Sequence, residues 1–430
     1  MPITPPRRGY TLWDPVQQPA NPADHFGIAD SVRRMASMGA NVARVSVSWG
    51  GSVFELPPLQ DGPNSSWVDD QLEHVHELVE EGRKEREDFK ALITFDGLPS
   101  WVDGVSRNGH FTYTEAGCEQ YGAAVVHVLN VLGEDCGWIE IGNEVNQVQW
   151  VMRPGGELGL DSTKPVSREN PPRKDVADPS QGPRDPDNPH AGDAPNFEYS
   201  RMVAYAIDRV DNCADLRRDD GAPEQQVLAG SIAIRGGADS WVSGLDPEDY
   251  VVMMRDNINF GLFMLCQTDN ARRLRMQRSW GLSTHLYPRL GHNLYDTSGN
   301  LVSYAVGNNT GDMTGEDAKD TVADNYEVFA SSASSGGWVR DVWITETGIS
   351  SHKVGLTEQA IFHSRLWNYL YDKQTQLRGV INFGFTDLDP MMVDPNGAYR
   401  EMGVISPATG LPLKPSGSAD TNGWTWAGWI

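Results

Sequence analysis

Two glutamates of this chain are placed where their carboxyl groups could act as an acid and a nucleophile. Glu144 ends the segment Ile139-Glu140-Ile141-Gly142-Asn143-Glu144, and Glu346 follows Val342-Trp343-Ile344-Thr345. Each comes after an apolar, strand-like run. Cleavage of a glycosidic bond needs a pair of carboxyl groups, because one protonates the departing oxygen while the other meets the sugar carbon. The sequence therefore predicts this chemistry for the pair.

The elements that would position these glutamates are short β-rich runs that alternate with helical stretches. Such alternation is typical of parallel strands joined by helices, and eight strands predict a (β/α)8 TIM barrel of the α/β class. Several of the helical stretches begin with Asp, Thr or Asn, which cap free amide groups. We predict strands at 9–13, 41–49, 90–95, 138–141, 226–234, 281–287, 342–345 and 379–385, and helices at 23–38, 69–86, 114–132, 197–217, 247–257, 318–334 and 357–373.

The barrel is expected to form one catalytic domain over 1–430, because such barrels hold more than 400 residues as one unit. Segment 153–196 differs from the rest, since it is crowded with Pro, Asp, Gly and Asn and has almost no apolar periodicity. A loop of this length is uncommon in a compact domain and is usually functional or disordered. We expect a long insertion after strand four that lies over the catalytic face and walls the cleft, or else a mobile insertion with no role.

Motifs in the same order along nearly the whole chain resemble the glycoside hydrolases of clan A. They are Gly142-Asn143-Glu144 after strand four, His285-Leu286-Tyr287 at strand six and Thr345-Glu346-Thr347-Gly348 at strand seven, supported by Arg44 in the second strand and by Leu98-Pro99-Ser100-Trp101 after the third. These enzymes are retaining barrel glycosidases of the cellulase, mannanase and xylosidase type. The resemblance implies the same fold and double displacement through a covalent glycosyl-enzyme.

The resemblance also implies a role for each matching residue. Glu144 corresponds to the acid/base and Glu346 to the nucleophile, with Tyr287 donating its hydroxyl to Glu346. Asn143 looks like the residue that hydrogen-bonds the sugar 2-hydroxyl, a contact that strengthens in the transition state. Arg44, a permanent cation, would lie below the nucleophile, and His285 would line the same wall.

The chain departs from the family pattern at two strand ends, where Phe95-Asp96 and Phe385 replace the usual His and Trp. Phe385 could serve as the platform under the cleaved sugar. Asp96 and Asp387 are candidates for hydrogen bonds to sugar hydroxyls or, equally, for turn caps. Among the tryptophans, Trp101 and Trp150 are candidate sugar platforms that could instead pack in the core, whereas core packing is favoured for Trp49.

Composition and charge exclude several other kinds of partner. The formal net charge is -24, which would repel nucleic-acid phosphates and anionic membranes, so a neutral carbohydrate substrate fits best. No apolar run approaches the length of a membrane span. We expect a monomer that needs no cofactor. No export signal is seen, so an extracellular site of action would require a trimmed leader, and a cytoplasmic one would not.

Four alternatives are considered from the sequence. The His74-Val75-His76 segment is a weak candidate for a metal, because residues two apart on a helix point in different directions. Asp185-Pro186-Asp187-Asn188 does not match a calcium loop. Cys118, Cys136, Cys213 and Cys266 have no zinc spacing and are expected as buried thiols, with a Cys118 to Cys136 disulfide as the rival. A noncatalytic carbohydrate-binding barrel is the alternative to an enzyme.

Overall fold

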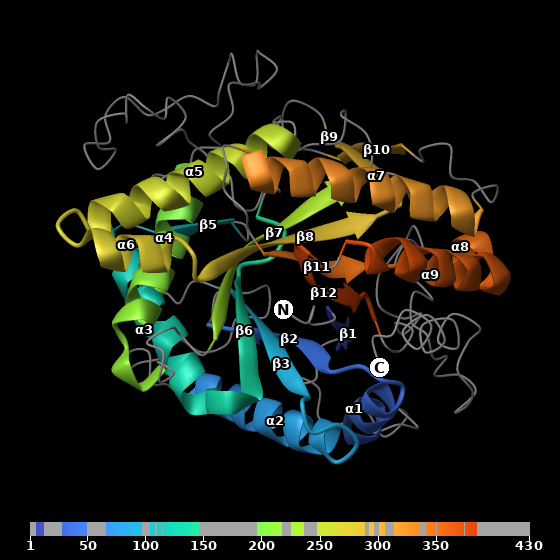
Figure 1. Ribbon diagram of the computed structural model, residues 1–430, viewed down its shortest axis with the longest axis horizontal. Coiled ribbons are helices and arrows are strands. Elements are labelled where there is room, and N and C mark those ends of the chain that lie inside the picture. The colour runs from blue at the N-terminus through green and yellow to red at the C-terminus, as the bar shows by residue number, and fades with distance from the viewer. Residues whose placement is uncertain are drawn as a thin grey trace.

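The eight predicted strands form a closed parallel barrel in the computed structural model (Figure 1). Its strands are β1 (Arg7–Thr11), β2 (Val42–Ser48), β3 (Lys90–Asp96), β6 (Cys136–Ile141), β7 (Gln226–Arg235), β8 (Trp280–Tyr287), β11 (Val342–Thr347) and β12 (Leu377–Asn382). Around the barrel they run β1-β12-β11-β8-β7-β6-β3-β2, and β1 pairs with both β12 and β2. The predicted fold class is therefore confirmed.

The structure describes residues 6–12, 28–49, 66–96, 104–107, 110–113, 115–145, 196–216, 225–235, 247–288, 292–295, 301–305, 314–335, 341–349, 351–373 and 375–384. All of segment 153–196 except Asn196 lies outside these ranges, so the predictions for it are not tested.

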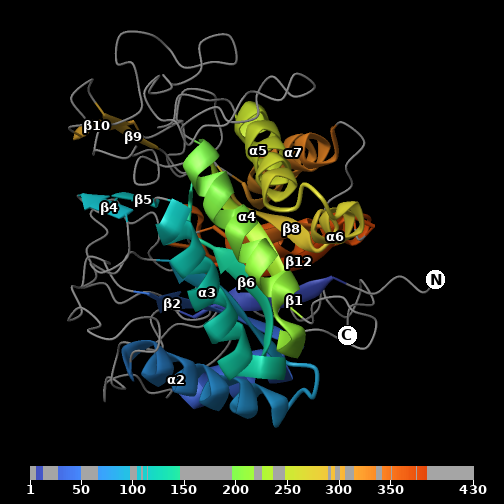
Figure 2. The same cartoon turned by 90° about the vertical axis from the view of Figure 1, so that its left-hand side faces the viewer.

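Helices follow the strands and surround the barrel. They are α1 (Ile28–Ser37), α2 (Ser66–Arg83), α3 (Glu115–Leu132), α4 (Asn196–Asn212), α5 (Pro247–Leu265), α6 (Asn270–Met276), α7 (Gly315–Ser334), α8 (Ser351–Val354) and α9 (Leu356–Tyr371). In the side view, α3 and α4 lie next to each other outside the barrel near β6 (Figure 2). This ring shields the outer faces of the strands from water.

Several predicted helix boundaries were wrong, and short elements were missed. The helix predicted at 247–257 continues as α5 to Leu265, because Ile258 and Leu262 are fully buried one turn apart. The helix predicted at 197–217 ends at Asn212 and is followed by a 3-10 turn. The short helices α6 and α8 were not predicted, nor were the hairpins β4 (Gly104–Arg107) with β5 (His110–Tyr113) and β9 (His292–Tyr295) with β10 (Leu301–Ala305).

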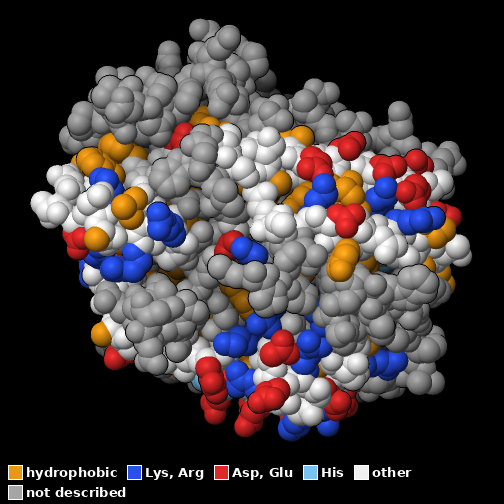
Figure 3. Space-filling view, viewed as in Figure 1, with side chains coloured by type: hydrophobic (Ala, Val, Ile, Leu, Met, Phe, Trp, Pro, Cys, Tyr) orange, Lys and Arg blue, Asp and Glu red, His pale blue; other side chains and the backbone are white. Residues whose placement is uncertain are grey.

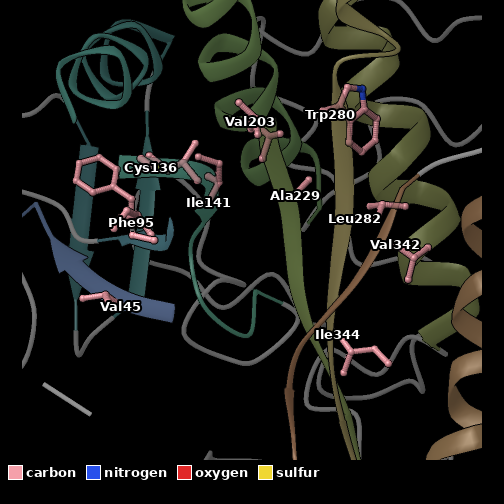
Figure 4. Close-up of a cluster of buried hydrophobic side chains, with 14 of the residues drawn as sticks. Val45, Phe95, Cys136, Ile141, Val203, Ala229, Trp280, Leu282, Val342 and Ile344 are labelled. Carbon is pink, nitrogen blue, oxygen red and sulfur yellow. The ribbon is translucent and has the colours of Figure 1, made fainter. Parts of the chain in front are cut away.

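The main hydrophobic core lies between the strands and the helices (Figure 4). Alternate strand residues such as Val45, Ile141 and Ile344 face outward into it, as the two-residue period of a strand requires. Trp49 is fully buried and packs against Phe95 and Tyr121, with ring centroids 6.2 Å and 5.6 Å away. The prediction that Trp49 belongs to the core is confirmed.

Inside the barrel, the side chains change from apolar to polar along the strands. A small cluster of Val42, Leu92, Leu228, Trp343 and Ile381 fills one level, with Trp138 packed on it. Arg44, Thr94 and Thr345 lie two residues further along three of these strands. Each of them donates a hydrogen bond to the carboxylate of Glu140 across the interior. The apolar level thus supports a buried polar level nearer the carboxyl ends of the strands.

The described surface carries charges of both signs. Figure 3 shows Lys and Arg interspersed with Asp and Glu over α7 and α9, where Lys319 and Arg365 both pair with Glu316. None of the described helices combines the length and apolar character that crossing a bilayer requires.

Candidate active site

Residues from four parts of the barrel meet at the carboxyl ends of its strands. Arg44 comes from β2, His285 and Tyr287 from β8, and Glu346 from β11, while Asn143 and Glu144 follow β6. His285 and Glu346 are partners in the β8 to β11 register, which places them side by side. The structure therefore brings together the six residues for which the sequence analysis predicts central roles.

Both carboxylate oxygens of Glu346 are held by donors. The Tyr287 hydroxyl donates to Oε2 at 2.6 Å, and Arg44 Nη1 donates to Oε1 at 2.6 Å. The Glu346 side chain is 9% exposed, whereas Arg44 is nearly fully buried behind it. These contacts fix the direction of the carboxylate and leave only a small part of it open to a ligand.

Glu144 lies on a turn beyond β6 rather than on the strand itself. Gly142 has φ +73° and Glu144 has φ +49°, a left-handed conformation that costs energy for a residue with a side chain. One carboxylate oxygen of Glu144, one of Glu346 and a ring nitrogen of His285 all lie within 4.8 Å of one another. The turn thus directs the Glu144 carboxyl back over the barrel toward Glu346.

His285 and Asn143 complete the wall between the two glutamates. His285 is fully buried, and its Nδ1 lies 3.2 Å from Glu144 Oε1 and 3.3 Å from Glu346 Oε2. The Asn143 Oδ1 atom accepts from Arg44 Nη2 at 2.9 Å, and Ser231 Oγ lies 3.3 Å from it. With its oxygen engaged in this way, the Asn143 carboxamide has a defined orientation, and its NH2 group is the donor side.

Glu140 is a third carboxylate of the site, and the sequence motifs predicted no role for it. It is fully buried, and its Oε2 accepts from Arg44 Nε at 2.9 Å, Arg44 Nη2 at 2.7 Å and Thr94 Oγ1 at 2.8 Å, while Thr345 Oγ1 donates to Oε1 at 2.6 Å. Burial would raise the pKa of Glu140, but the charge of Arg44 and the hydroxyl donors outweigh it and lower that pKa. A charged residue between Ile139 and Ile141 in a buried strand was the sequence signal for it.

The other predicted contacts with substrate cannot be placed. Trp101, Trp150, Phe385 and Asp387 lie outside the described residues. Asp96 ends β3, and its side chain is likewise outside the description. The roles given to these five residues therefore stay predictions.

The alternative sites from the sequence analysis gain no support from the described residues. All four cysteines are free, so the rival disulfide between Cys118 and Cys136 does not form. The prediction of buried thiols is confirmed for three of them, whereas Cys213 is only partly buried. His74 contacts Glu77 and His76 contacts Asp135 and the carbonyl of Val131. The segment 185–188 lies outside the described residues.

Of the described side chains, Glu144, His285 and Glu346 form the group that is close enough to ligate a metal ion. Both oxygens of Glu346 are already engaged by Arg44 and Tyr287, and the Arg44 cation would repel a second cation. This environment suits a neutral ligand better than a divalent ion.

Solved structures of glycoside hydrolases share this barrel. A family 5, subfamily 18 enzyme from Streptomyces cattleya, solved with GlcNAc, is 16% identical over 99% of this chain and 81% of its own, with a TM-score of 0.58, and another structure of that enzyme holds Manβ1-4GlcNAc. A broad-specificity family 5 endoglucanase from Clostridium longisporum is 12% identical over 98% of this chain and 96% of its own, with a TM-score of 0.52.

A family 39 glycoside hydrolase from Bacteroides cellulosilyticus is 16% identical over 98% of this chain, with a TM-score of 0.50, and this chain spans 64% of its length. No protein-family model and no curated protein matches the sequence. Families 5 and 39 belong to clan A, so the resemblance seen in the motifs extends to the fold. At these identities the likeness concerns the fold alone.

Proposed function

We propose that the chain is a retaining glycoside hydrolase that cleaves β-linked O-glycosidic bonds of a polysaccharide or oligosaccharide. The observation that carries the proposal is the approach of Glu144 and Glu346, whose nearest carboxylate oxygens are within 4.8 Å. Retaining enzymes place the two carboxyl groups about 5 to 5.5 Å apart, whereas inverting enzymes need about 6.5 to 9.5 Å to admit a water molecule. The short separation favours direct attack by a carboxylate.

In the first step, a Glu346 oxygen attacks the anomeric carbon. The bond from this carbon to the glycosidic oxygen breaks, the electron pair stays on that oxygen, and the proton of Glu144 moves to it. Arg44 and Tyr287 hold the Glu346 carboxylate at the correct angle for attack. Asn143, oriented by Arg44, would donate to the sugar 2-hydroxyl.

In the second step, Glu144 acts as the base. It takes a proton from a water molecule whose oxygen attacks the anomeric carbon, and the bond between that carbon and Glu346 breaks. Glu346 leaves as a carboxylate and Glu144 is protonated again, so both residues return to their starting states. The product keeps its anomeric configuration because two inversions have occurred.

The substrate class follows from charge and from the structural neighbours. A chain with net charge -24 favours a neutral glycan, and a structural neighbour holds the β-linked disaccharide Manβ1-4GlcNAc. Both support a neutral β-linked carbohydrate as the ligand of this barrel.

The decisive test is Glu346→Ala, assayed on aryl glycosides with and without azide. Loss of the nucleophile should lower turnover by more than about a thousandfold, and azide should restore some product with inverted configuration. Unchanged turnover would remove Glu346 from the mechanism. Sugar binding by the unaltered chain with no turnover on any glycan would instead support the noncatalytic barrel.

The role of Glu144 is tested by comparing leaving groups. Glu144→Ala should slow hydrolysis of substrates with poor leaving groups by about 100- to 10,000-fold and that of activated aryl glycosides far less, because only the former need a proton on the departing oxygen. Rates are measured over a series of aryl glycosides of graded acidity. An equal loss across the series would contradict the acid role.

A further inference from the structure

Ser231 is held in an unusual conformation at a bulge in β7. The register of β7 against β8 shifts between Gly230 and Ile232, and Gly230 and Ser231 have φ values of +118° and +57°. The backbone N–H of Ser231 donates to Ser283 Oγ at 2.7 Å, which fixes the bulge. A left-handed serine costs energy that a glycine would not, and such strain concentrates at functional sites.

The bulge aims the Ser231 hydroxyl at the buried face of His285. Ser231 Oγ lies 2.6 Å from His285 Nε2, and the cationic Arg44 Nη2, which can only donate, lies 3.4 Å from the same nitrogen. On the other side of the ring, Nδ1 faces Glu144 Oε1 at 3.2 Å and Glu346 Oε2 at 3.3 Å. Nε2 therefore faces donors, and Nδ1 faces carboxylate oxygens.

These neighbours assign the neutral imidazole to the tautomer with its hydrogen on Nδ1. A neutral histidine has one donor nitrogen and one acceptor nitrogen, and the neighbours match this when Nε2 accepts from Ser231 and Nδ1 donates to the carboxylate oxygens. Arg44 Nη2 gives its hydrogens to Glu140 and Asn143, so it contributes only its positive charge beside Nε2. The hydroxyl of Ser231 has one hydrogen to give. Its 2.6 Å distance to Nε2 is shorter than the 3.3 Å to Asn143 Oδ1, which already accepts from Arg44.

We propose that Ser231 is a positioning residue that keeps the hydrogen of His285 on Nδ1, where it serves Glu144 and Glu346 in turn. This inference rests on the proposed function. Before the first step the negative charge is on Glu346, and in the glycosyl-enzyme it is on Glu144, because Glu346 is then an ester. Since the two Nδ1 distances differ by only 0.1 Å (3.3 minus 3.2), the same N–H can donate to whichever carboxylate is charged.

The tautomer is measured directly by ring nitrogen NMR on the full chain with 15N-labelled histidine, without substrate. The chain has 10 histidines, and His285→Gln identifies the signals of His285 by their loss. The unaltered chain at neutral pH should show a protonated Nδ1 and an unprotonated Nε2. A proton on Nε2, in either the other tautomer or the imidazolium, would overturn the proposal.

Two substitutions separate the hydroxyl from the backbone strain. Ser231→Ala and Ser231→Gly both remove the hydroxyl, but only alanine keeps a Cβ in the left-handed conformation. Both variants should lose roughly tenfold in kcat/KM. They should lose a similar factor in kcat on an aryl glycoside whose turnover is limited by the second step. A tenfold loss is the size of effect expected for one hydrogen bond. Ser231→Gly should nevertheless melt at a higher temperature than Ser231→Ala.

The outcomes distinguish a positioning role from a structural one. If activity followed the melting temperature, so that Ser231→Gly regained the activity of the unaltered chain, the hydroxyl would have no positioning role. A loss in kcat/KM with no loss in the rate of the second step would contradict the proposal that His285 Nδ1 donates to both carboxylates in turn. Because the NMR measurement needs no substrate, it stands even if the Glu346→Ala test shows that the chain is not a glycosidase.

Discussion

At the scale of single residues, Arg44 connects the groups of the candidate site. Its guanidinium donates to Glu140, Glu346 and Asn143, and both carboxylates are largely or fully buried. One cation therefore faces two anions inside the barrel. Removing one partner of such a buried group is strongly destabilising, because it leaves desolvated charge without compensation.

Glu140→Gln should lower the free energy of unfolding by about 3 kcal/mol at pH 7, the lower end of the cost of breaking a buried ion pair. The pKa of Glu140 is lowered in the folded chain. Its contribution is therefore fully present above the unfolded value of about 4.3 and is lost as the pH falls through the lower folded value. Urea unfolding at pH 7 and in acid should show the difference between the two chains shrinking as the pH falls.

Glu77→Gln is the matched control for this experiment. The Glu77 side chain is 67% exposed and contacts only His74 among the ion pairs of the described residues, so its change should stay within about 0.5 kcal/mol. A difference between the unaltered chain and Glu140→Gln that is the same at pH 7 and at pH 3 would show that the ionised form of Glu140 is not the stabilising one.

At the scale of elements, the sequence predicted the barrel strands well because most of them contain apolar, strand-forming residues and are buried on both faces. The hairpin of β4 and β5 was missed although Asn108-Gly109, a pair typical of tight hairpin turns, lies between its strands. The end of α5 was missed because it is fixed by burial of Ile258 and Leu262 rather than by a local stop signal. Tertiary packing, rather than the local sequence pattern, thus determines where α5 ends.

The candidate site was predictable to the same extent. Motifs identified Glu144, Glu346 and their immediate partners. The position of Glu140, a charged residue inside an apolar strand, was a further signal in the sequence from which no role was predicted. Ser231 could not be found from the sequence, because its contact with His285 depends on a register shift in β7. A bulge changes which way a side chain points without a distinctive local sequence.

Gly379 tests how tightly β12 packs against the interior of the barrel. A Cβ atom at this position would lie 2.0 Å from the ring of Trp343, which is almost fully buried between Gly379 and Trp138. Gly379→Ala should therefore lower the free energy of unfolding by about 3 kcal/mol, as overpacked cores do. The measurement is chemical unfolding at neutral pH.

Gly137→Ala in β6 is the control for a strand glycine with room beside it. An added Cβ there would meet only the Lys90 side chain, at 3.3 Å, and the Ala91 carbonyl oxygen, at 4.0 Å, and a lysine side chain can move aside. Its unfolding free energy should change by less than about 1 kcal/mol. Equal effects of the two alanines would show that the Trp343 contact does not limit the space at Gly379.

At the scale of the whole molecule, the barrel is closed by its first and last strands. β1 hydrogen-bonds to β12 on one side and to β2 on the other. The pairing of β1 with β12 brings together residues that are far apart in the sequence, such as Arg7 and Gly379. Closure leaves the barrel without exposed edges. We therefore propose that 1–430 folds as one domain with a single unfolding transition.

Removal of residues 1–11 deletes β1 and tests this closure. The truncated chain should lose its cooperative thermal transition and its hydrolytic activity, because β12 and β2 would become open edges and Arg44, which pairs in register with Thr11, would lose the strand beside it. Calorimetry and turnover of an aryl glycoside measure the two effects. Removal of residues 1–5 leaves β1 intact and should preserve both the transition and the activity. If the chain without β1 unfolded in the same way as the full-length chain, the other strands would hold the barrel by themselves.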